Sequence, residues 1–158
     1  MNFNPLSKYY KKEDYLWSLT ALVAGCAVIY LGDWVLGVSL EVNFGMATYS
    51  PLWVLDLILV PFIAGLVVSF IYGLGGKILA HFPPLIVRCI EYFTLEAGDY
   101  PEGVSILPLG FWILIVIVVV EAASAGGFVG EVVIKRTYGR SPKHTTHKRY
   151  QLKEEKVD

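Results

Sequence analysis

The sequence has few of the residues that metal-dependent and thiol enzymes rely on. It contains only two cysteines, Cys26 and Cys89, and three histidines. The two cysteines are far apart and form no CxxC motif, so neither a disulfide framework nor a zinc site is indicated. His144 and His147 have the spacing to share a metal ion, but no further ligands lie nearby in the sequence. We therefore expect no cofactor and no bound metal.

Catalytic and nucleotide-binding motifs are also missing. The glycines at 73, 75 and 76 are not part of a GxxxxGK[ST] phosphate loop, and no strand is predicted before them. The sequence has no recognisable Ser/His/Asp or Cys/His arrangement and no HExxH motif. We expect a protein that is not an enzyme; a membrane enzyme acting on lipids is the alternative that these absences disfavour.

Long apolar runs are abundant. Of the 158 residues, 55% are hydrophobic, and the mean hydropathy is +0.55. These values and the length of the runs predict an all-α integral membrane protein with one membrane domain. The predicted segments are a polar juxtamembrane N-terminus at 1–14, a membrane domain at 15–134 with spans at about 15–36, 52–72 and 106–130, and a basic C-terminal tail at 135–158.

A fourth apolar segment, 78–95, differs because polar residues recur on one side of it. Their spacing alternates between four and three residues, which places them on one narrow stripe of a helix. The stripe consists of Lys77, His81, Pro84, Arg88 and Glu91. The Pro83-Pro84 pair would break a helix that runs through it. The segment is predicted either as a kinked crossing or as an interfacial or re-entrant helix.

The basic residues bear on the number of crossings. Residues 135–158 contain eight basic and three acidic residues, although the whole chain has a net charge of −1. With four crossings both termini and the turn at Lys77 share one side, and the loops on the other side have no basic residue. The positive-inside rule then places both termini in the cytoplasm, in a multi-pass protein of the inner (cytoplasmic) cell membrane. With three crossings the termini lie on opposite sides, and the rule gives no clear orientation.

The N-terminal region has a second interpretation. Basic residues, an apolar run and the sequence up to Cys26 are typical of a bacterial lipoprotein signal. The apolar run continues beyond Cys26 instead of changing to a polar linker. A first transmembrane span with a cytoplasmic N-terminus is therefore preferred.

Carboxylates within the apolar runs are the main candidates for function. Asp33 ends the first span, Asp56 begins the second, and Glu121 lies well inside the last. Ionisable groups inside a membrane are costly and by default mark functional positions. Asp33 and Asp56 could pair with Arg88, line a proton or cation path, or touch water at headgroup depth. Glu121 could form a hydrogen bond to a neighbouring helix or subunit. Together with the stripe, the candidate ion or interface residues are Asp33, Asp56, His81, Arg88, Glu91 and Glu121.

Small residues and the basic tail predict contacts with neighbouring helices and partners. The helix-packing candidates are Ala21, Gly25, Ala122, Ala123, Gly126, Gly127 and Gly130. The tail is expected to bind anionic lipid headgroups or an acidic partner surface, and no nucleic acid. Its basic residues next to the membrane are Lys135, Arg136, Arg140, Lys143, Lys148 and Arg149.

These features favour a non-catalytic small subunit, accessory or structural, of a larger integral membrane complex. Such a subunit would contact the lipid bilayer and other membrane-protein subunits through small-residue helix faces and the tail. The alternative is a small ion or proton carrier or channel that acts as a homo-oligomer and uses the intramembrane acids.

Overall fold

The computed structural model describes residues 6–95 and 104–138, with side chains from Tyr15 onwards except those of Ala47 and Tyr138. Four of its helices are long and apolar enough to cross a membrane: Tyr15–Leu36, Pro51–Tyr72, Gly76–Leu95 and Leu109–Thr137. The chain is thus an all-α, multi-pass membrane protein, as the sequence predicts. The predicted tail residues Arg140, Lys143, Lys148 and Arg149 lie outside the described residues.

The elements follow one another in a simple order. They are α1 (Leu6–Leu36), β1 (Val42–Asn43), a 3₁₀ turn (Gly45–Thr48), α2 (Pro51–Tyr72), α3 (Gly76–Leu79), α4 (Phe82–Leu95), β2 (Ser105–Ile106) and α5 (Leu109–Tyr138). Local chemistry explains the boundaries of α2. The Ser50 hydroxyl accepts a hydrogen bond from the Trp53 amide at 3.2 Å, and Pro51 fits the first turn. Gly73, with φ of 87°, caps the other end.

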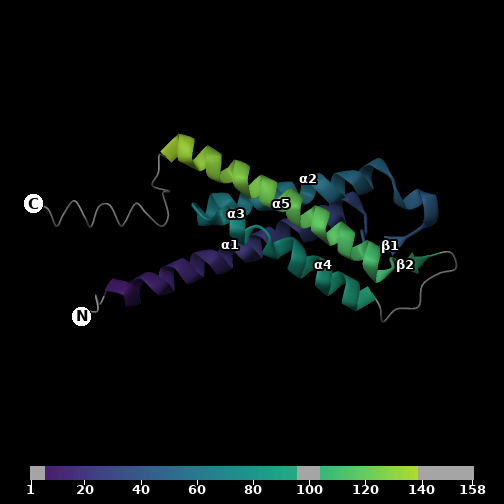
Figure 1. Ribbon diagram of the computed structural model, residues 1–158, viewed down its shortest axis with the longest axis horizontal. Coiled ribbons are helices and arrows are strands. Elements are labelled where there is room, and N and C mark those ends of the chain that lie inside the picture. Colours follow the sequence, from purple (N-terminus) through teal and green to yellow (C-terminus); the bar gives the residue numbers. More distant parts are fainter. Residues whose placement is uncertain (1–5, 96–103, 139–158) are drawn as a thin grey trace, which may run out of the picture.

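The helices form an elongated bundle in which α2 packs against α1, α3 and α5 (Figure 1). The beginning of α1 and the end of α5 lie at the same end, which we call the basic end because Lys135 and Arg136 are exposed there. The two short strands lie at the opposite end, the sheet end. The third candidate span, Gly76–Leu95, consists of α3 and α4, and the two prolines of α4 fall in its first turn.

A two-stranded antiparallel ladder closes the sheet end. Val42 pairs with Ile106, and Asn43 pairs with Ser105. The ladder extends by a hydrogen bond of 2.9 Å from the Leu107 amide to the Glu41 carbonyl. Because residues 105 and 106 belong to this ladder, the last helix begins at Leu109 and not at 106. It also runs on to Tyr138, so that Lys135 and Arg136 belong to its last turn and not to a separate tail.

Aromatic residues pack beneath the ladder. Tyr92 of α4 stacks on Trp112 of α5 with ring centroids 4.4 Å apart, and its hydroxyl donates to the Leu107 carbonyl at 3.2 Å. Leu40 and Trp53 complete this part of the core. The packing fixes the segment that follows α1 over the ends of α2 and α4.

Glycines allow α2 and α5 to approach until their backbones touch. A Cβ atom on Gly65 would collide with the Ala123 carbonyl, and one on Gly126 would collide with the Phe62 carbonyl. The Ser69 hydroxyl donates to the Gly127 carbonyl at 2.7 Å across the same contact. The predicted small-residue face of the last span is therefore used within the chain.

Candidate functional site

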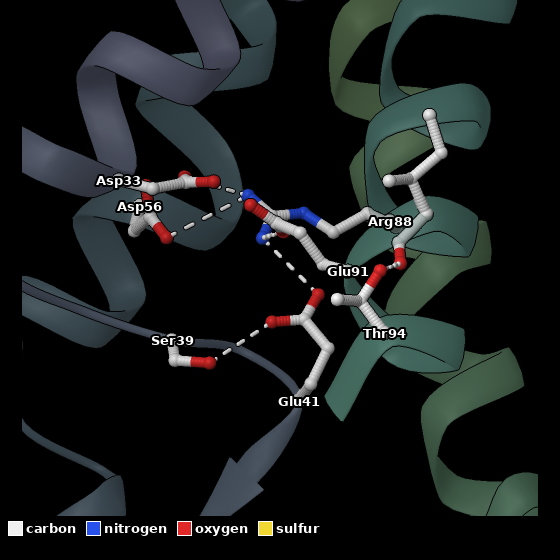
Figure 2. A network of polar contacts seen from close by, with 8 residues as sticks. Asp33, Ser39, Glu41, Asp56, Arg88, Glu91 and Thr94 are labelled. Carbon is white, nitrogen blue, oxygen red and sulfur yellow. Dashed lines mark hydrogen bonds and ion pairs between the residues drawn. The ribbon is translucent and has the colours of Figure 1, made fainter. Parts of the chain in front are cut away.

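A buried arginine with four carboxylates occupies the sheet end of the bundle. We call this group the Arg88 cluster, and its members are Asp33, Glu41, Asp56, Arg88 and Glu91 (Figure 2). Asp33 lies in the last turn of α1, Asp56 in the second turn of α2, and Arg88 and Glu91 one turn apart on α4. Glu41 comes from the segment that leads into β1. The cluster thus joins three helices and the connection between two of them.

The guanidinium group of Arg88 donates in three directions. Nη2 donates to Oδ1 of Asp33 at 2.7 Å. Nη1 donates to Oε2 of Glu91 at 2.8 Å and to Oε1 of Glu41 at 3.2 Å. The nearest oxygen of Asp56, Oδ2, is 3.8 Å from Nη2, which is an ion pair but too long for a hydrogen bond. Charge-assisted bonds of this kind are roughly twice as strong as neutral ones.

Negative charge exceeds positive charge in this cluster. One guanidinium faces four carboxylates. The side chains of Arg88, Glu41 and Asp56 are at most 1% exposed, whereas Glu91 is 25% exposed at the edge. Burying several unpaired charges costs several kcal/mol each, so the cluster is satisfied electrostatically only if further positive charge is bound.

Several polar atoms of the cluster have no hydrogen-bond partner. They are Oδ2 of Asp33, both carboxylate oxygens of Asp56 and Nε of Arg88. Asp56 is fully buried. Glu41, by contrast, accepts a second hydrogen bond from the Ser39 hydroxyl at 3.1 Å. The deficit of donors is therefore concentrated on the two aspartates.

Apolar residues separate the Arg88 cluster from the basic end. Ile29, Val60, Ala64 and Val87 pack directly beneath it. Ala21, Val68 and Ala80 form the next layer. Both layers therefore have an apolar core between the Arg88 cluster and the basic end.

A second polar contact lies at the basic end. Oε1 of Glu131 accepts hydrogen bonds from the amides of Gly75, at 2.7 Å, and Lys77, at 3.2 Å. A carboxylate is favoured at this position because the first amides of a helix have no partner within the helix. Lys135 approaches Oε2 of Glu131 to 3.8 Å from an exposed position. This contact holds the α2–α3 turn on α5.

The other predicted site residues do not join the Arg88 cluster. His81 is half-buried, and its Nδ1 lies 3.1 Å from the carbonyl of Ile78. Lys77 is exposed, so the predicted stripe does not share one environment. Glu121 lies on the exposed side of α5, and within the described part of the chain it makes no hydrogen bond or ion pair. Among the described residues, the predicted hydrogen bond of Glu121 to a neighbouring helix is thus not made.

The helix-packing candidates make contacts within the chain. Ala21 and Ala123 are fully buried. A Cβ on Gly25 would meet the side chains of Pro83 and Val68. Three further candidates, Gly126, Gly127 and Gly130, lie on the α5 surface that faces α2 and α3. The last candidate, Ala122, is half-buried.

Two acids of these sites were not among the candidates identified from the sequence. Glu41 falls in a connection whose polar residues are typical of a solvated loop, and only the β1–β2 ladder places it over Arg88. Glu131 is followed four residues later by Lys135, a spacing typical of an ordinary surface pair. The sequence signal that could have identified Glu131 is its position in an apolar helix opposite a glycine-rich turn.

Comparisons of this chain with protein-family models, with curated proteins and with solved structures find no match. In the residues that the structure describes, no group of three or more His, Cys, Asp or Glu side chains is arranged to hold a metal ion. Within the Arg88 cluster the guanidinium itself lies among the carboxylates (Figure 2).

Proposed function

We propose that this protein is a small non-catalytic subunit of a larger integral membrane complex and that it docks through the exposed face of α5 around Glu121. The observation that carries this proposal is the position of Glu121. It lies 12 residues after Leu109, the first residue of α5. At 1.5 Å per residue this is about 18 Å along the helix, near the middle of the hydrocarbon layer.

The surroundings of Glu121 are apolar and exposed. Leu114, Val118, Ala125 and Phe128 lie on the same side of α5 at steps of three or four residues. An ionisable side chain facing lipid at mid-span costs about 3 kcal/mol. A basic or hydrogen-bonding residue on a helix of another chain would remove most of this cost. We define the α5 stripe as Leu114, Val118, Glu121, Ala125 and Phe128.

The small-residue faces already pack within the chain, so we propose the α5 stripe as the surface that binds a partner. Gly126 and its neighbours are occupied by α2, and Gly25 is occupied by α4 and α2. Docking therefore depends on the acid at the centre of the stripe and on apolar area beside it. The basic residues after α5 are proposed to contact anionic lipid headgroups or an acidic surface of the same complex.

We also propose that Gly76–Leu95 crosses the membrane, which gives four crossings. In support, α1 begins and α5 ends at the basic end, while α4 ends at the sheet end beside β2 (Figure 1). The basic residues Lys77, Lys135 and Arg136 would then face the cytoplasm together with both termini. The membrane would be the inner (cytoplasmic) cell membrane.

A second function, proton or ion carriage by a homo-oligomer, is favoured by the excess of carboxylates in the Arg88 cluster. Against it, the apolar layers around Val60 and Val68 separate the cluster from the basic end. A carrier needs access to its site from both sides, and these apolar layers oppose access from the basic end. The subunit is therefore the preferred proposal.

Purification through a tag in mild detergent tests the proposal. We expect chains of different sequence to co-purify at fixed stoichiometry. Glu121→Leu should reduce their yield about tenfold, because one hydrogen bond within a membrane contributes about 1–2 kcal/mol. The control is Tyr30→Phe, which removes a polar group from the exposed face of α1 and should change nothing. A chain that purifies alone or only with its own copies contradicts the proposal.

A further inference from the structure

Two aspartates of the Arg88 cluster approach the same nitrogen. Oδ1 of Asp33 lies 2.7 Å from Nη2 of Arg88, and Oδ2 of Asp56 lies 3.8 Å from it. Asp33 is 8% exposed and Asp56 is not exposed at all. Both carboxylates therefore face the same guanidinium nitrogen, and Asp56 is closed off from water.

The hydrogen-bonding needs of the two aspartates are complementary. With both groups ionised, Oδ2 of Asp33 and both oxygens of Asp56 are buried acceptors without donors. A buried acceptor without a partner costs about 1–3 kcal/mol, and more when it is charged. A proton on Asp56 converts this carboxylate into a donor, and Oδ2 of Asp33 is an acceptor that lacks one.

The other two carboxylates of the cluster have hydrogen-bond donors. Glu91 accepts a bond of 2.8 Å from Arg88 and is partly exposed. Glu41 accepts hydrogen bonds from Arg88 and from Ser39. The guanidinium group of Arg88 thus already donates three hydrogen bonds to other carboxylates. Asp56 interacts with its positive charge only as an ion pair at 3.8 Å.

Groups from every neighbouring element bear on Asp56. The charged groups that act on it are Asp33 of α1, Arg88 of α4 and Glu41 of the connecting segment. Glu91 lies beyond Arg88. The titratable residues of α5 are remote from it, because Glu121 faces outwards and the others lie at the basic end; these others are Glu131, Lys135 and Arg136.

We propose that Asp33 and Asp56 together bind one proton at neutral pH, held by Asp56 and donated to Oδ2 of Asp33, and that its release at alkaline pH loosens the contact between α1 and α2. The site takes its proton from the sheet end and does not pass it on, because apolar residues lie beneath it. This inference does not depend on docking through Glu121.

The sign of the pH dependence follows from the count of protons. In the unfolded chain an aspartate is ionised above about pH 4. Over the range in which the folded chain still holds the extra proton, the folded state binds one more proton than the unfolded state. Stability then falls as pH rises, by about tenfold in the folding equilibrium constant per pH unit. The decline ends where the folded state also releases the proton.

The test is the unfolding midpoint of the full chain in detergent micelles between about pH 6 and about pH 9, a range in which aspartates in an unfolded chain are already ionised. The wild type should lose stability across this range. In Asp56→Asn the amide can donate to Oδ2 of Asp33 without titrating, so this dependence should be lost. Glu121→Gln, which removes a carboxyl group that faces away from the cluster, is the control and should keep it. A wild type without pH dependence, or Asp56→Asn with the wild-type dependence, overturns the proposal.

Infrared spectroscopy gives a second measurement that needs no folded Asp56 variant. The proton should appear as the carbonyl stretch of a carboxylic acid at neutral pH and vanish at alkaline pH. Glu121→Gln serves as the background, because it removes the lipid-facing carboxyl group. Absence of the band in a folded Glu121→Gln chain at neutral pH overturns the proposal, and its presence with loss at alkaline pH supports it.

Discussion

Nη2 of Arg88 donates a hydrogen bond of 2.7 Å to Oδ1 of Asp33, which joins the middle of α4 to the last turn of α1. The two residues are 55 positions apart in the sequence. The same guanidinium also binds Glu41, which the β1–β2 ladder holds in place. A single side chain therefore connects the elements at the sheet end, and its removal should affect all of them.

Arg88→Met should destabilise the fold strongly. Removal of one partner from a buried ion pair costs about 3–5 kcal/mol, because the remaining charges have no compensation. Arg88→Lys should lie between this variant and the wild type, since an ammonium group keeps the charge but cannot donate in the same three directions. Unfolding midpoints in detergent measure both effects. Lys77→Met, at an exposed position, is the control and should be near wild type. Equal losses of stability in Arg88→Met and Lys77→Met would contradict the role assigned to Arg88.

Glu131→Leu should weaken the contact between α5 and the α2–α3 turn. It removes the acceptor for the amides of Gly75 and Lys77, which costs about 1–3 kcal/mol. Glu131→Gln keeps one acceptor oxygen and should lose less. Hydrogen exchange at those two amides is the direct readout. Lys135→Met tests the exposed ion pair and should cost under about 1 kcal/mol; a larger loss there than in Glu131→Leu would be inconsistent with this view.

Gly126→Ala should separate α2 from α5. The added methyl group would collide with the carbonyl of Phe62, and backbone atoms cannot move aside cheaply. Overpacking of this kind costs about 1–3 kcal/mol or more. Gly110→Ala is the matched control, because nothing lies within 4 Å of its Cβ position. That variant should be neutral or slightly more stable, since alanine favours a helix. The unfolding midpoints of the two variants should therefore differ, with Gly126→Ala lower.

Four crossings predict which positions can be labelled from each side of the membrane. In a chain with Cys26 and Cys89 replaced by alanine, cysteines at positions 77 and 135 should react with an impermeant reagent from one side. A cysteine at position 46, where the methionine is 91% exposed at the sheet end, should react only from the other side. Labelling of positions 77 and 135 from opposite sides would instead indicate that Gly76–Leu95 does not cross.

The membrane fold and much of the Arg88 cluster could be predicted from the sequence. Apolar length indicates the spans, and the costs of burying Asp33, Asp56 and Arg88 in a membrane make their pairing one of the arrangements that the sequence offers, beside an ion path and contact with water. The spacing of Arg88 and Glu91 predicts that they are neighbours on a helix.

The features of the site that could not be predicted from the sequence depend on contacts between segments far apart in the chain. Glu41 enters the cluster because a two-residue ladder, far too short for a strand signal, positions its segment. His81 stays out of the cluster although it lies on the predicted stripe, because α4 begins only at Phe82. The small residues around Gly126 lie against α2, and the sequence did not indicate that this neighbouring helix would belong to the same chain.

Photo-crosslinking in intact membranes tests the proposed subunit role most directly. A photoreactive residue at position 118 or 125, on either side of Glu121 in the α5 stripe, should crosslink to one chain of different sequence. The same residue at position 23, on the exposed face of α1, should not. Glu121→Leu should reduce the crosslinks about tenfold, in line with loss of one intramembrane hydrogen bond. Crosslinks only to lipid or to copies of this chain would contradict the account.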